Sequence, residues 1–382
     1  MRTVCVLIVN RANYGRVKFL LKKIKKDKNL KLQIVLASST LLKNYGRLDK
    51  VITKDGFNIN KKFYSHIAGE NNETMAKSAG LLTMELSSVF YDLKPDIILT
   101  IADRYETLAT AITASYMNIC LAHLQGGELT GSIDESVRHA VTKLSHIHLA
   151  CTEESKKRII QMGEQPKKVF NVGCPSIDQI KFINFNKKLS LEKYNNGVGY
   201  KVDLNKRYVV VMMHPITNDK AETIKNIKNT IAAISKINIQ CVWFWPNIDA
   251  GSNRISNYIR AFRENTPNSK INFYTNFETE DFLKLIKNAT CLIGNSSSGI
   301  REGSYLRTPV VNIGSRQDCR ERGDNVLDCS GNFSDIVKSI KKQINRKKIK
   351  INNIYGNGNS SEKILKIFKT VKLNIDKKFR DI

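Results

Sequence analysis

The clearest chemical feature of the sequence is a serine-rich segment, Gly294–Glu302, which reads GNSSSGIRE. It directly follows the apolar run Thr290–Ile293, which is typical of a buried parallel strand, and it precedes a segment that can start a helix. Backbone N–H groups and the positive end of a helix dipole favour an anion at such a place, and the hydroxyls add donors. The segment therefore predicts a phosphate site at the carboxyl edge of a sheet, although an ordinary serine-rich loop fits the local sequence equally well.

Polar side chains also follow most of the other strands that the sequence predicts, at the edge where ligands of open α/β sheets bind. Taken alone, Asp103 beside Arg104 could be a surface ion pair with an N-cap role. Several polar strand ends in one chain favour a ligand cleft over a set of solvated loops. These segments are Asn10–Asn13, Ala102–Glu106, Gln125–Glu128 with Asp134–His139, His214–Pro215, Pro246–Ser252 and Gly314–Gln317.

Several common kinds of site are not indicated. His146 and His148 are two residues apart on a predicted strand and share a face, but no cysteine or carboxylate stands at zinc-site spacing, so we expect no metal. The first strand is not followed by G-x-G-x-x-G, the nicotinamide fingerprint. The sequence also has no phosphate-binding G-x-x-x-x-G-K-[ST] loop and no G-x-S-x-G nucleophile elbow.

The elements that must position these residues alternate between strand and helix, which indicates α/β layers with parallel sheets. One alternation runs from a strand at Thr3–Val9 to a segment at Lys168–Val172, and a second from a strand at Tyr208–Met213 to a helix at Asp335–Asn345. We therefore expect two Rossmann-like, doubly wound domains facing a cleft. The expected parts are a first domain at 1–180, a linker at 181–207 rich in Lys and Asn, a second domain at 208–358 and a C-terminal helix in 359–382.

Length and composition fit this plan. The 382 residues suit about two to three domains, and 41% hydrophobic residues are enough for proper cores. No apolar run approaches the ~18 residues of a membrane helix, and the N-terminus reads as a strand, not a signal peptide. The eight cysteines are scattered without a C-x-x-C pair, so free thiols in a reducing cytoplasm are expected.

The net charge of +27 is compatible with nucleic acid, an anionic membrane surface or an anionic small substrate as a partner. Clusters such as Lys22–Lys26 lie on the predicted outer face of a helix, which favours a solvated face. No basic stripe with interleaved aromatic residues and no known nucleic-acid motif is present. We therefore expect neither a nucleic-acid partner nor a membrane partner.

Taken together, the motifs resemble the hydrolysing UDP-N-acetylglucosamine 2-epimerases. The resemblance covers nearly the whole chain and is specific, because the motifs come in the family's order and at its spacing. The motifs that carry it are Asn10–Ala12, Ala102–Glu106, Gly126–Glu128 with Gly131–Glu135, Arg138–His146, His214–Pro215, Pro246–Ser252, Gly294–Glu302 and Ser315–Gln317.

The resemblance implies two Rossmann-type halves in the GT-B arrangement, with the C-terminal helix returning to the first domain. The implied reaction converts UDP-N-acetylglucosamine and water into N-acetylmannosamine and UDP, by elimination to 2-acetamidoglucal and then hydration. It would be the first step of nonulosonic (sialic-type) acid synthesis and would need no metal and no other cofactor. A cytoplasmic homodimer or homotetramer is expected.

The resemblance also implies roles for particular residues, through the motifs that contain them. Asp103 and Asp134 match acid–base carboxylates, and His214 matches a histidine at the diphosphate or the leaving oxygen. Arg104 would lie beside the sugar and the phosphate. The other expected ligands are Arg11, Ser296, Ser297 and Arg316 for the diphosphate, and Asn247, Asp249, Ser252 and Glu302 for the nucleotide or its ribose.

Two positions depart from the family's pattern. Many members have a catalytic glutamate where this chain has Gln125, and a glutamine cannot take up a proton at neutral pH. Either Glu128 or a water replaces that glutamate, or Gln125 binds a substrate group. Many members also have a histidine where this chain has Ser38–Thr40, after the second strand.

These departures leave an alternative substrate open, a UDP-2,4-diacetamido-2,4,6-trideoxyhexose, on which the related enzymes of legionaminic-type pathways act. A non-hydrolysing 2-epimerase would share the fold, although Gly126–Glu128 with Asp134–Glu135 argues against it by resemblance. A GT-B glycosyltransferase would need an acceptor site that the sequence does not reveal. A basic nucleic-acid-binding protein would explain the charge but would leave the polar strand ends unexplained.

Overall fold

The computed structural model contains two compact α/β units. The first holds residues 1–128, 133–181 and 355–382, and the second holds residues 129–132 and 182–354. The structure describes residues 1–43, 47–69, 71–130, 133–194, 197–216, 219–246, 252–267, 269–346, 349–378 and 380.

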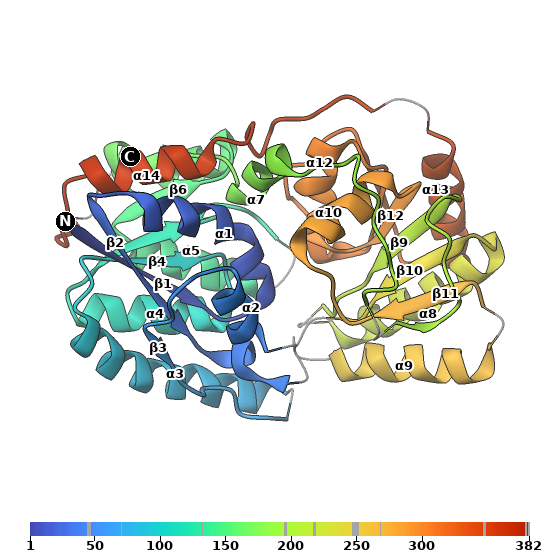
Figure 1. Cartoon of the computed structure of the whole chain (residues 1–382), viewed down its shortest axis with the longest axis horizontal. Coiled ribbons are helices and arrows are strands. Elements are labelled where there is room, and N and C mark those ends of the chain that lie inside the picture. Colours follow the sequence, from blue (N-terminus) through green and yellow to red (C-terminus); the bar gives the residue numbers. More distant parts are fainter. Residues whose placement is uncertain are drawn as a thin grey trace. The chain divides into compact units, whose positions relative to one another are not determined.

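The first unit is built on a parallel sheet of seven strands in the order β3-β2-β1-β4-β5-β6-β7, with helices on both of its faces (Figure 1). Its strands are β1 (Arg2–Ile8), β2 (Leu30–Leu36), β3 (Lys61–Lys62), β4 (Ile97–Ile101), β5 (Cys120–Leu124), β6 (Ile147–Ala150) and β7 (Val169–Asn171). Its helices are α1 (Arg11–Lys26), α2 (Leu48–Lys54), α3 (Asn72–Leu93), α4 (Tyr105–Tyr116), α5 (Asp134–Leu144), α6 (Glu153–Gln161), α7 (Pro175–Asp178) and α14 (Ser360–Thr370).

The strand order of the first sheet reverses between β1 and β4, because the chain proceeds from β1 to β2 on one side and returns to β4 on the other. Ligands of open α/β sheets bind outside the carboxyl ends of the strands at such a switch point. The segments that leave β1 and β4 begin with Asn10 and Ala102. The topology therefore brings Arg11 and Asp103 to the same edge of the first sheet.

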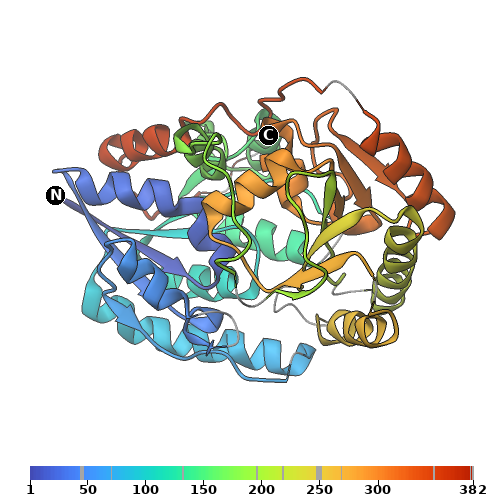
Figure 2. The same ribbon diagram turned by 45° about the vertical axis from the view of Figure 1, so that its right-hand side comes forward.

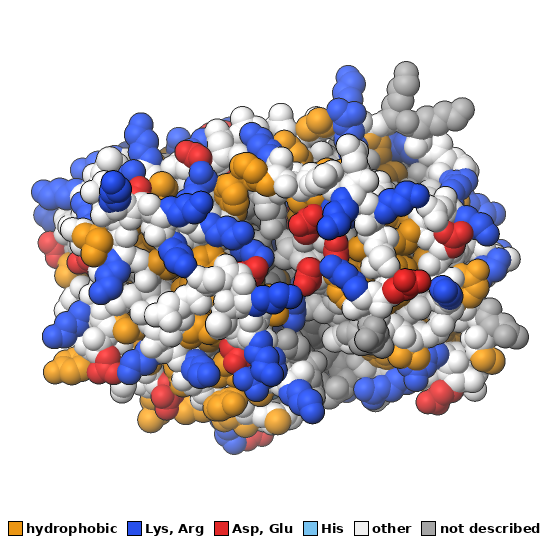
Figure 3. All heavy atoms as spheres, viewed as in Figure 1, with side chains coloured by type: hydrophobic (Ala, Val, Ile, Leu, Met, Phe, Trp, Pro, Cys, Tyr) orange, Lys and Arg blue, Asp and Glu red, His pale blue; other side chains and the backbone are white. Residues whose placement is uncertain are grey.

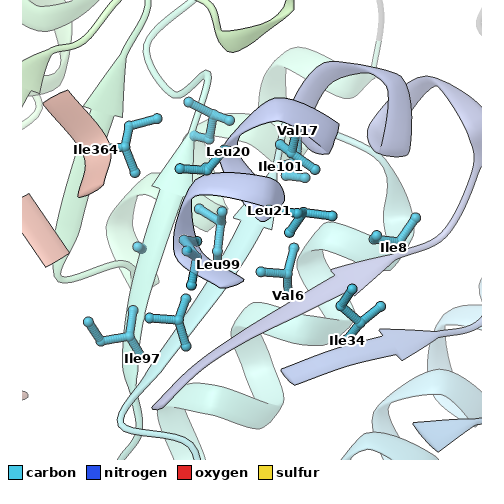
Figure 4. Close-up of a cluster of buried hydrophobic side chains, with 14 of the residues drawn as sticks. Val6, Ile8, Val17, Leu20, Leu21, Ile34, Ile97, Leu99, Ile101 and Ile364 are labelled. Carbon is cyan, nitrogen blue, oxygen red and sulfur yellow. The ribbon is translucent and has the colours of Figure 1, made fainter. Parts of the chain in front are cut away.

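Apolar periodicity explains how α1 packs on this sheet. Val17, Leu20 and Leu21 recur at helical spacing and face the strand residues Val6 and Leu99 in the buried cluster (Figure 4). Asn10 caps the helix by accepting a hydrogen bond from the Asn13 N–H at 2.8 Å, which fixes where α1 begins.

The helix α14 completes the same core, although it lies at the far end of the sequence. Ile364 and Phe368 are fully buried in the cluster that contains Leu20, and Figures 1 and 2 both draw α14 alongside α1. Asp178 caps α14, since its carboxylate accepts from the backbone N–H groups of Ser360 at 2.9 Å and Ser361 at 2.6 Å. A buried carboxylate at a helix N-terminus is also favoured by the helix dipole.

The second unit is built on another seven-stranded sheet, in the order β14-β13-β12-β9-β10-β11-β8, which is parallel except for β8. Its strands are β8 (Val198–Gly199), β9 (Tyr208–Met212), β10 (Gln240–Phe244), β11 (Ile271–Tyr274), β12 (Cys291–Gly294), β13 (Val310–Ile313) and β14 (Val326–Cys329). Its helices are α8 (Lys220–Ile237), α9 (Ser252–Asn265), α10 (Thr279–Asn288), α11 (Ser297–Ile300), α12 (Glu302–Leu306) and α13 (Phe333–Ile344).

The second sheet reverses its order between β9 and β12. The two segments that leave these strands begin with Met213 and His214 after β9, and with Asn295 and Ser296 after β12. The serine-rich segment therefore lies at the switch point of its sheet, where the sequence predicts a ligand.

The prediction of two Rossmann-like α/β domains is confirmed. The segment 181–207, which we expected to be a linker, contributes the edge strand β8, whose two residues are too few to produce a visible alternation. No described helix is both long and apolar enough to cross a bilayer. All eight cysteines are free thiols. Lys and Arg side chains are spread over the face drawn in Figure 3 and form no single stripe there.

Candidate functional site

Arg138 is the centre of the polar groups at the carboxyl edge of the first sheet. It lies on the buried face of α5, and only 1% of its side chain is exposed. Its guanidinium forms an ion pair with the Asp103 carboxylate after β4 and donates a hydrogen bond to the Glu128 carbonyl oxygen after β5 at 2.6 Å. Arg138 therefore links the loops that follow two neighbouring strands.

All three predicted catalytic carboxylates lie close enough to affect this guanidinium. Burial lowers the pKa of Arg138, but nearby negative charges outweigh that effect and hold the pKa above its ordinary value. The groups that raise it are the side chains of Asp103, Glu128 and Asp134. Asp134 is the first residue of α5, one turn before Arg138. The structure thus brings these three carboxylates near one buried cation.

Gln125 is held by protein groups. Arg16 of α1 donates to its Oε1 at 3.2 Å, and its Nε2 donates to the Cys174 sulfur at 3.4 Å. A guanidinium only donates, so the amide oxygen must face Arg16. Gln125 is 1% exposed and has a φ of 71°, in the left-handed region. Its side chain therefore orients Arg16, a residue that the sequence did not single out.

Arg104 and the serine loop after β2 share one buried carboxylate, that of Glu106. Glu106 Oε2 accepts from Arg104 Nε at 3.0 Å, and Glu106 Oε1 accepts from the Ser38 hydroxyl at 2.9 Å. Burial raises the pKa of Tyr105, whose hydroxyl lies 3.3 Å from that of Ser38. Arg104 thus pairs with Glu106, and Asp103 pairs with the buried Arg138.

In the second unit, Asn295 joins the segments that carry His214 and Arg316. Its side-chain amide accepts from the His214 backbone N–H at 2.8 Å and donates to the His214 carbonyl at 2.9 Å. Its own carbonyl accepts from Arg316 NH1 at 3.0 Å and from Gln317 Nε2 at 3.0 Å. Two predicted phosphate-binding groups, His214 and Arg316, therefore lie at the same strand edge as the serine-rich segment.

The serine-rich segment forms the predicted helix start, but α11 has only four residues, so its dipole is small. Ser296 is the N-cap and accepts from the Ser298 N–H at 3.3 Å, while Ser297 is half-buried. Glu302 begins α12, and its buried Oε2 has no hydrogen-bond partner among the described residues. An unpartnered buried carboxylate oxygen is suited to a ligand hydroxyl.

The structure says less about the other residues that the sequence predicts to bind the nucleotide. Arg11 is the first residue of α1 at the switch point of the first sheet, and Ser252 is the buried first residue of α9. Asn247 and Asp249 lie outside the described residues. For these two positions, the predicted role at the nucleotide rests on the sequence motif alone.

The histidines of the first sheet have partners within the protein. His148 Nε2 lies 3.0 Å from a carboxylate oxygen of Glu164, and His123 Nε2 lies 2.8 Å from the Ala102 carbonyl. His146 Nδ1 accepts from the Leu121 N–H at 3.1 Å. Within the described ranges, no group of three or more His, Cys, Asp or Glu side chains is arranged to hold a metal ion.

Arg138, Glu106 and Asn295 belong to the quoted motifs, but the sequence did not identify them as site residues. One available signal for Arg138 is its spacing. It stands three and four residues before Val141 and Thr142, so it lies on the buried face of α5. A buried arginine needs a charged partner. The contacts of Glu106 with Ser38 and of Asn295 with His214 join segments that follow different strands, which no local pattern reveals.

Comparison with known proteins identifies the family of the chain. A family model described as UDP-N-acetylglucosamine 2-epimerase matches residues 22–369. The chain is 33% identical over 374 residues to a hydrolysing UDP-N,N'-diacetylbacillosamine 2-epimerase of Legionella pneumophila, covering 98% of this chain and 97% of that protein. It is 36% identical over 337 residues to a hydrolysing GDP/UDP-N,N'-diacetylbacillosamine 2-epimerase of Campylobacter jejuni, covering 87% and 86%.

A solved structure shares the fold. The UDP-GlcNAc 2-epimerase of Methanocaldococcus jannaschii, in complex with UDP-GlcNAc and UDP, has a TM-score of 0.79 at 18% identity, covering 96% of this chain and 99% of that one. The family that the motifs predict is thereby confirmed. The chain belongs to the UDP-N-acetylglucosamine 2-epimerase family.

Proposed function

We propose that this protein is a hydrolysing 2-epimerase that acts on UDP-N,N'-diacetylbacillosamine, a UDP-2,4-diacetamido-2,4,6-trideoxyhexose. The observation that carries the proposal is that the Legionella and Campylobacter relatives, which match most of the chain, are both named for this sugar. It replaces our first expectation, UDP-N-acetylglucosamine. Gln125 and the segment Ser38–Thr40, where many family members have a glutamate and a histidine, are consistent with a changed sugar.

The first chemical step removes the C2 proton as the C1–O bond to UDP breaks, leaving a glycal. We assign the proton transfers to Asp103 and Asp134, because both side chains lie near Arg138 at the carboxyl edge of the first sheet. Glu128 is a third carboxylate at this place and can take the role of the family's glutamate. Gln125 has no proton-transfer role, because an amide does not titrate at neutral pH.

The diphosphate leaves with the bonding electrons of the C1–O bond, so it must be stabilised by cations and donors. We assign this role in the second unit to His214, Ser296, Ser297 and Arg316, and in the first unit to Arg11, with Arg104 beside the sugar. The unpartnered Glu302 Oε2 suits a ribose hydroxyl. Ser252, Asn247 and Asp249 are assigned to the nucleotide by their motif.

The second step adds water to the glycal. The hydroxyl joins C1, and a proton returns to C2 on the face opposite to the one it left. The sum of both steps consumes one substrate and one water and releases UDP and the free sugar with inverted C2. An acid and a base on opposite faces of the sugar meet this need, which is why two separate carboxylates are required.

The test is proton NMR in D2O with purified protein and, in parallel, UDP-N,N'-diacetylbacillosamine and UDP-N-acetylglucosamine. We expect UDP release with the first substrate, a free sugar inverted at C2, and deuterium at C2. Preferred turnover of UDP-N-acetylglucosamine would overturn the assigned sugar. Formation of an epimerised sugar nucleotide without UDP release would overturn the hydrolytic reaction.

The nucleotide is tested separately, since the name of the Campylobacter relative includes both GDP and UDP. We expect UDP to raise the melting temperature of the protein more than GDP at equal concentration, because a ligand that binds the native state more tightly stabilises it more. A larger increase of the melting temperature with GDP would mean that the substrate carries guanine instead of uracil. Light scattering on the same sample measures the homodimer or homotetramer that we also propose.

A further inference from the structure

We propose that Asn295 is a positioning residue that aligns His214 and Arg316 on the leaving diphosphate. The inference rests on the proposed function, in which the carboxyl edge of the second sheet holds the nucleotide's phosphates. Asn295 itself need not touch the substrate. It acts through the backbone of His214 and the side chain of Arg316, both of which it contacts.

The location of Asn295 is the first argument. It directly follows β12, and His214 follows β9 after one intervening residue, so the contact joins the two segments at the switch point of the second sheet. The strands β9 and β12 pair in parallel up to Met212 and Gly294. Beyond these residues the strand ladder stops, and the Asn295 side chain continues the connection between the two segments.

The second argument is the chemical complementarity of this contact. The His214 backbone offers one donor and one acceptor, and the Asn295 amide supplies one of each, at 2.8 Å and 2.9 Å. Asn295 is 1% exposed, so solvent does not compete for these groups. An aspartate would present only acceptors, and a leucine of similar size would present neither group. Two opposed hydrogen bonds fix both the position and the rotation of the His214 peptide.

The third argument concerns the main chain of Asn295. Its N–H donates to the Met212 carbonyl at 3.1 Å, and its carbonyl accepts from Arg316 at 3.0 Å. The preceding Gly294 has a φ of 133°, and a Cβ there would lie 2.1 Å from the Met212 carbonyl oxygen, so only glycine permits this close approach. The backbone at residue 295 is therefore fixed and cannot shift to compensate for a lost side chain.

The Arg316 segment is also held from its other side. Glu222 of α8 accepts from the Ser315 N–H at 2.9 Å and from the Ser315 hydroxyl at 2.8 Å. Arg316 thus extends from a segment fixed by Glu222 toward the carbonyl of Asn295. This arrangement pre-organises a cation and a histidine for developing negative charge, which is how enzymes stabilise a leaving group without reorganisation.

Gln240 offers a matched control, because it makes the same kind of contact at the opposite edge of the same sheet. It is the first residue of β10 and is 7% exposed. Its Oε1 accepts from the Asp203 N–H at 2.9 Å, and its Nε2 donates to the Asp203 carbonyl at 2.7 Å. Replacing Gln240 therefore removes a two-way contact with the backbone at the amino edge, away from the segments after β9 and β12.

The experiment compares Asn295→Leu with Gln240→Met, using isothermal titration with UDP alone and thermal melting. We expect both variants to lower the melting temperature, and only Asn295→Leu to weaken UDP binding by tenfold or more. Gln240→Met should stay within twofold of the wild type. Equal UDP affinities of the two variants would overturn the proposal. Failure of the wild type to bind UDP would instead count against the proposed function.

A double-mutant cycle tests whether Asn295 acts through His214. In the His214→Ala background, we expect Asn295→Leu to weaken UDP binding by less than threefold, because the histidine that the Asn295 side chain aligns is already gone and the main-chain contact with Arg316 is unchanged. If the double variant loses UDP affinity by the product of the two single-variant losses, Asn295 does not act through His214. If Asn295→Leu fails to fold, Asn295→Asp retains the acceptor for the His214 N–H. It should give an intermediate loss, and wild-type UDP affinity in that variant would overturn the proposal.

Discussion

At the scale of single residues, Arg138 determines how the carboxylates of the first sheet are arranged. Replacing it with methionine keeps an unbranched apolar stem but removes the buried positive charge beside Asp103 and the donor to Glu128. We expect kcat to fall by about 100-fold or more, which is the usual effect of losing one pre-organised electrostatic contact in an active site. Initial rates of UDP release measure this change.

The control for that substitution is Arg2→Met. Arg2 donates to the carbonyls of Phe368 at 2.7 Å and Val371 at 2.8 Å, at the opposite end of β1 from the site. It should alter stability but leave kcat within about threefold. An equal loss of kcat in both variants would mean that Arg138 contributes only to folding.

Gln125 yields a second prediction, because the amide is oriented by Arg16 and Cys174. A glutamate at this position still accepts from Arg16, whereas a methionine does not. We therefore expect Gln125→Glu to keep kcat/KM within about tenfold and Gln125→Met to lose more than that. A large gain of activity in Gln125→Glu would show that the natural glutamine weakens proton transfer, contrary to the assignment.

At the scale of elements, the attachment of α14 depends on the cap that Asp178 provides. Asp178→Ala removes a buried acceptor from two N–H groups of the helix. We expect the free energy of unfolding to fall by about 2 kcal/mol, the upper range for an N-cap and for hydrogen bonds to a charged group. Urea unfolding followed by circular dichroism measures the loss.

Asp27→Ala is the matched control on the same pair of helices. Asp27 is the C-cap of α1 and pairs with Lys369 of α14 at 2.9 Å, in a position that water reaches. Exposed ion pairs contribute little to stability, so this variant should unfold close to the wild-type midpoint. If Asp178→Ala and Asp27→Ala lowered the free energy of unfolding equally, the burial of Asp178 would not explain its contribution to stability.

The alternation of apolar strands and amphipathic helices was sufficient to predict most elements of both sheets. The runs that became β1, β9 and β12 are short, apolar and bounded by polar residues, so local pattern and final burial agree. Local pattern failed for β8, whose pairing with β11 depends on a partner more than 70 residues away.

The place of the candidate site residues in the fold was predictable in part for the same reason. Strand ends can be read from the sequence, and they carry Asp103, His214 and Ser296 to the edges where ligands bind. The cap that Asp178 gives to Ser360 spans 182 residues, and Arg138 meets Asp103 across 35 residues. Such contacts arise only when strands and helices from different parts of the sequence pack together, so no local pattern could reveal them.

At the scale of the whole molecule, we expect the buried histidines to make the stability of the protein depend on pH. Burial lowers the pKa of His123 to about 3 and that of His146 to about 4. Both are neutral in the native state at pH 6, where unfolded histidines already bind protons, so stability is complete above pH ~6.5 and falls as the pH decreases. Each fully buried histidine contributes a slope of about 1.4 kcal/mol per pH unit in this window.

Urea unfolding at pH 7.5, 6.0 and 5.0 tests this dependence by comparing the wild type with His123→Gln. We expect the variant to be less stable at pH 7.5 but to lose stability less steeply toward pH 5. Glu164 affects the stability of the protein only at a lower pH than the histidines do. Burial raises its pKa, but hydrogen bonds from His148 and two lysines outweigh burial and lower it to about 2. Parallel slopes in wild type and variant would exclude His123 as the titrating group.

The net charge of +27 has a kinetic consequence for an anionic substrate. A positively charged protein attracts a sugar nucleotide over distances that salt shortens to about 10 Å at 0.1 M. We expect kcat/KM to fall severalfold between 20 and 300 mM salt, with kcat nearly unchanged. A random DNA duplex should not inhibit turnover at 150 mM salt, and strong inhibition there would revive the nucleic-acid alternative.

The position of α14 has a further consequence during biosynthesis. Ile364 and Phe368 belong to the core around Leu20, yet the ribosome makes them only after the whole second unit. While residues 182–354 are being synthesised, the apolar side of α1 that α14 will cover stays open on the nascent chain. Domains usually fold in the order of their synthesis, but here the N-terminal unit must wait for the last helix. Chaperones that bind exposed apolar surface therefore have a long interval in which to act on the first unit.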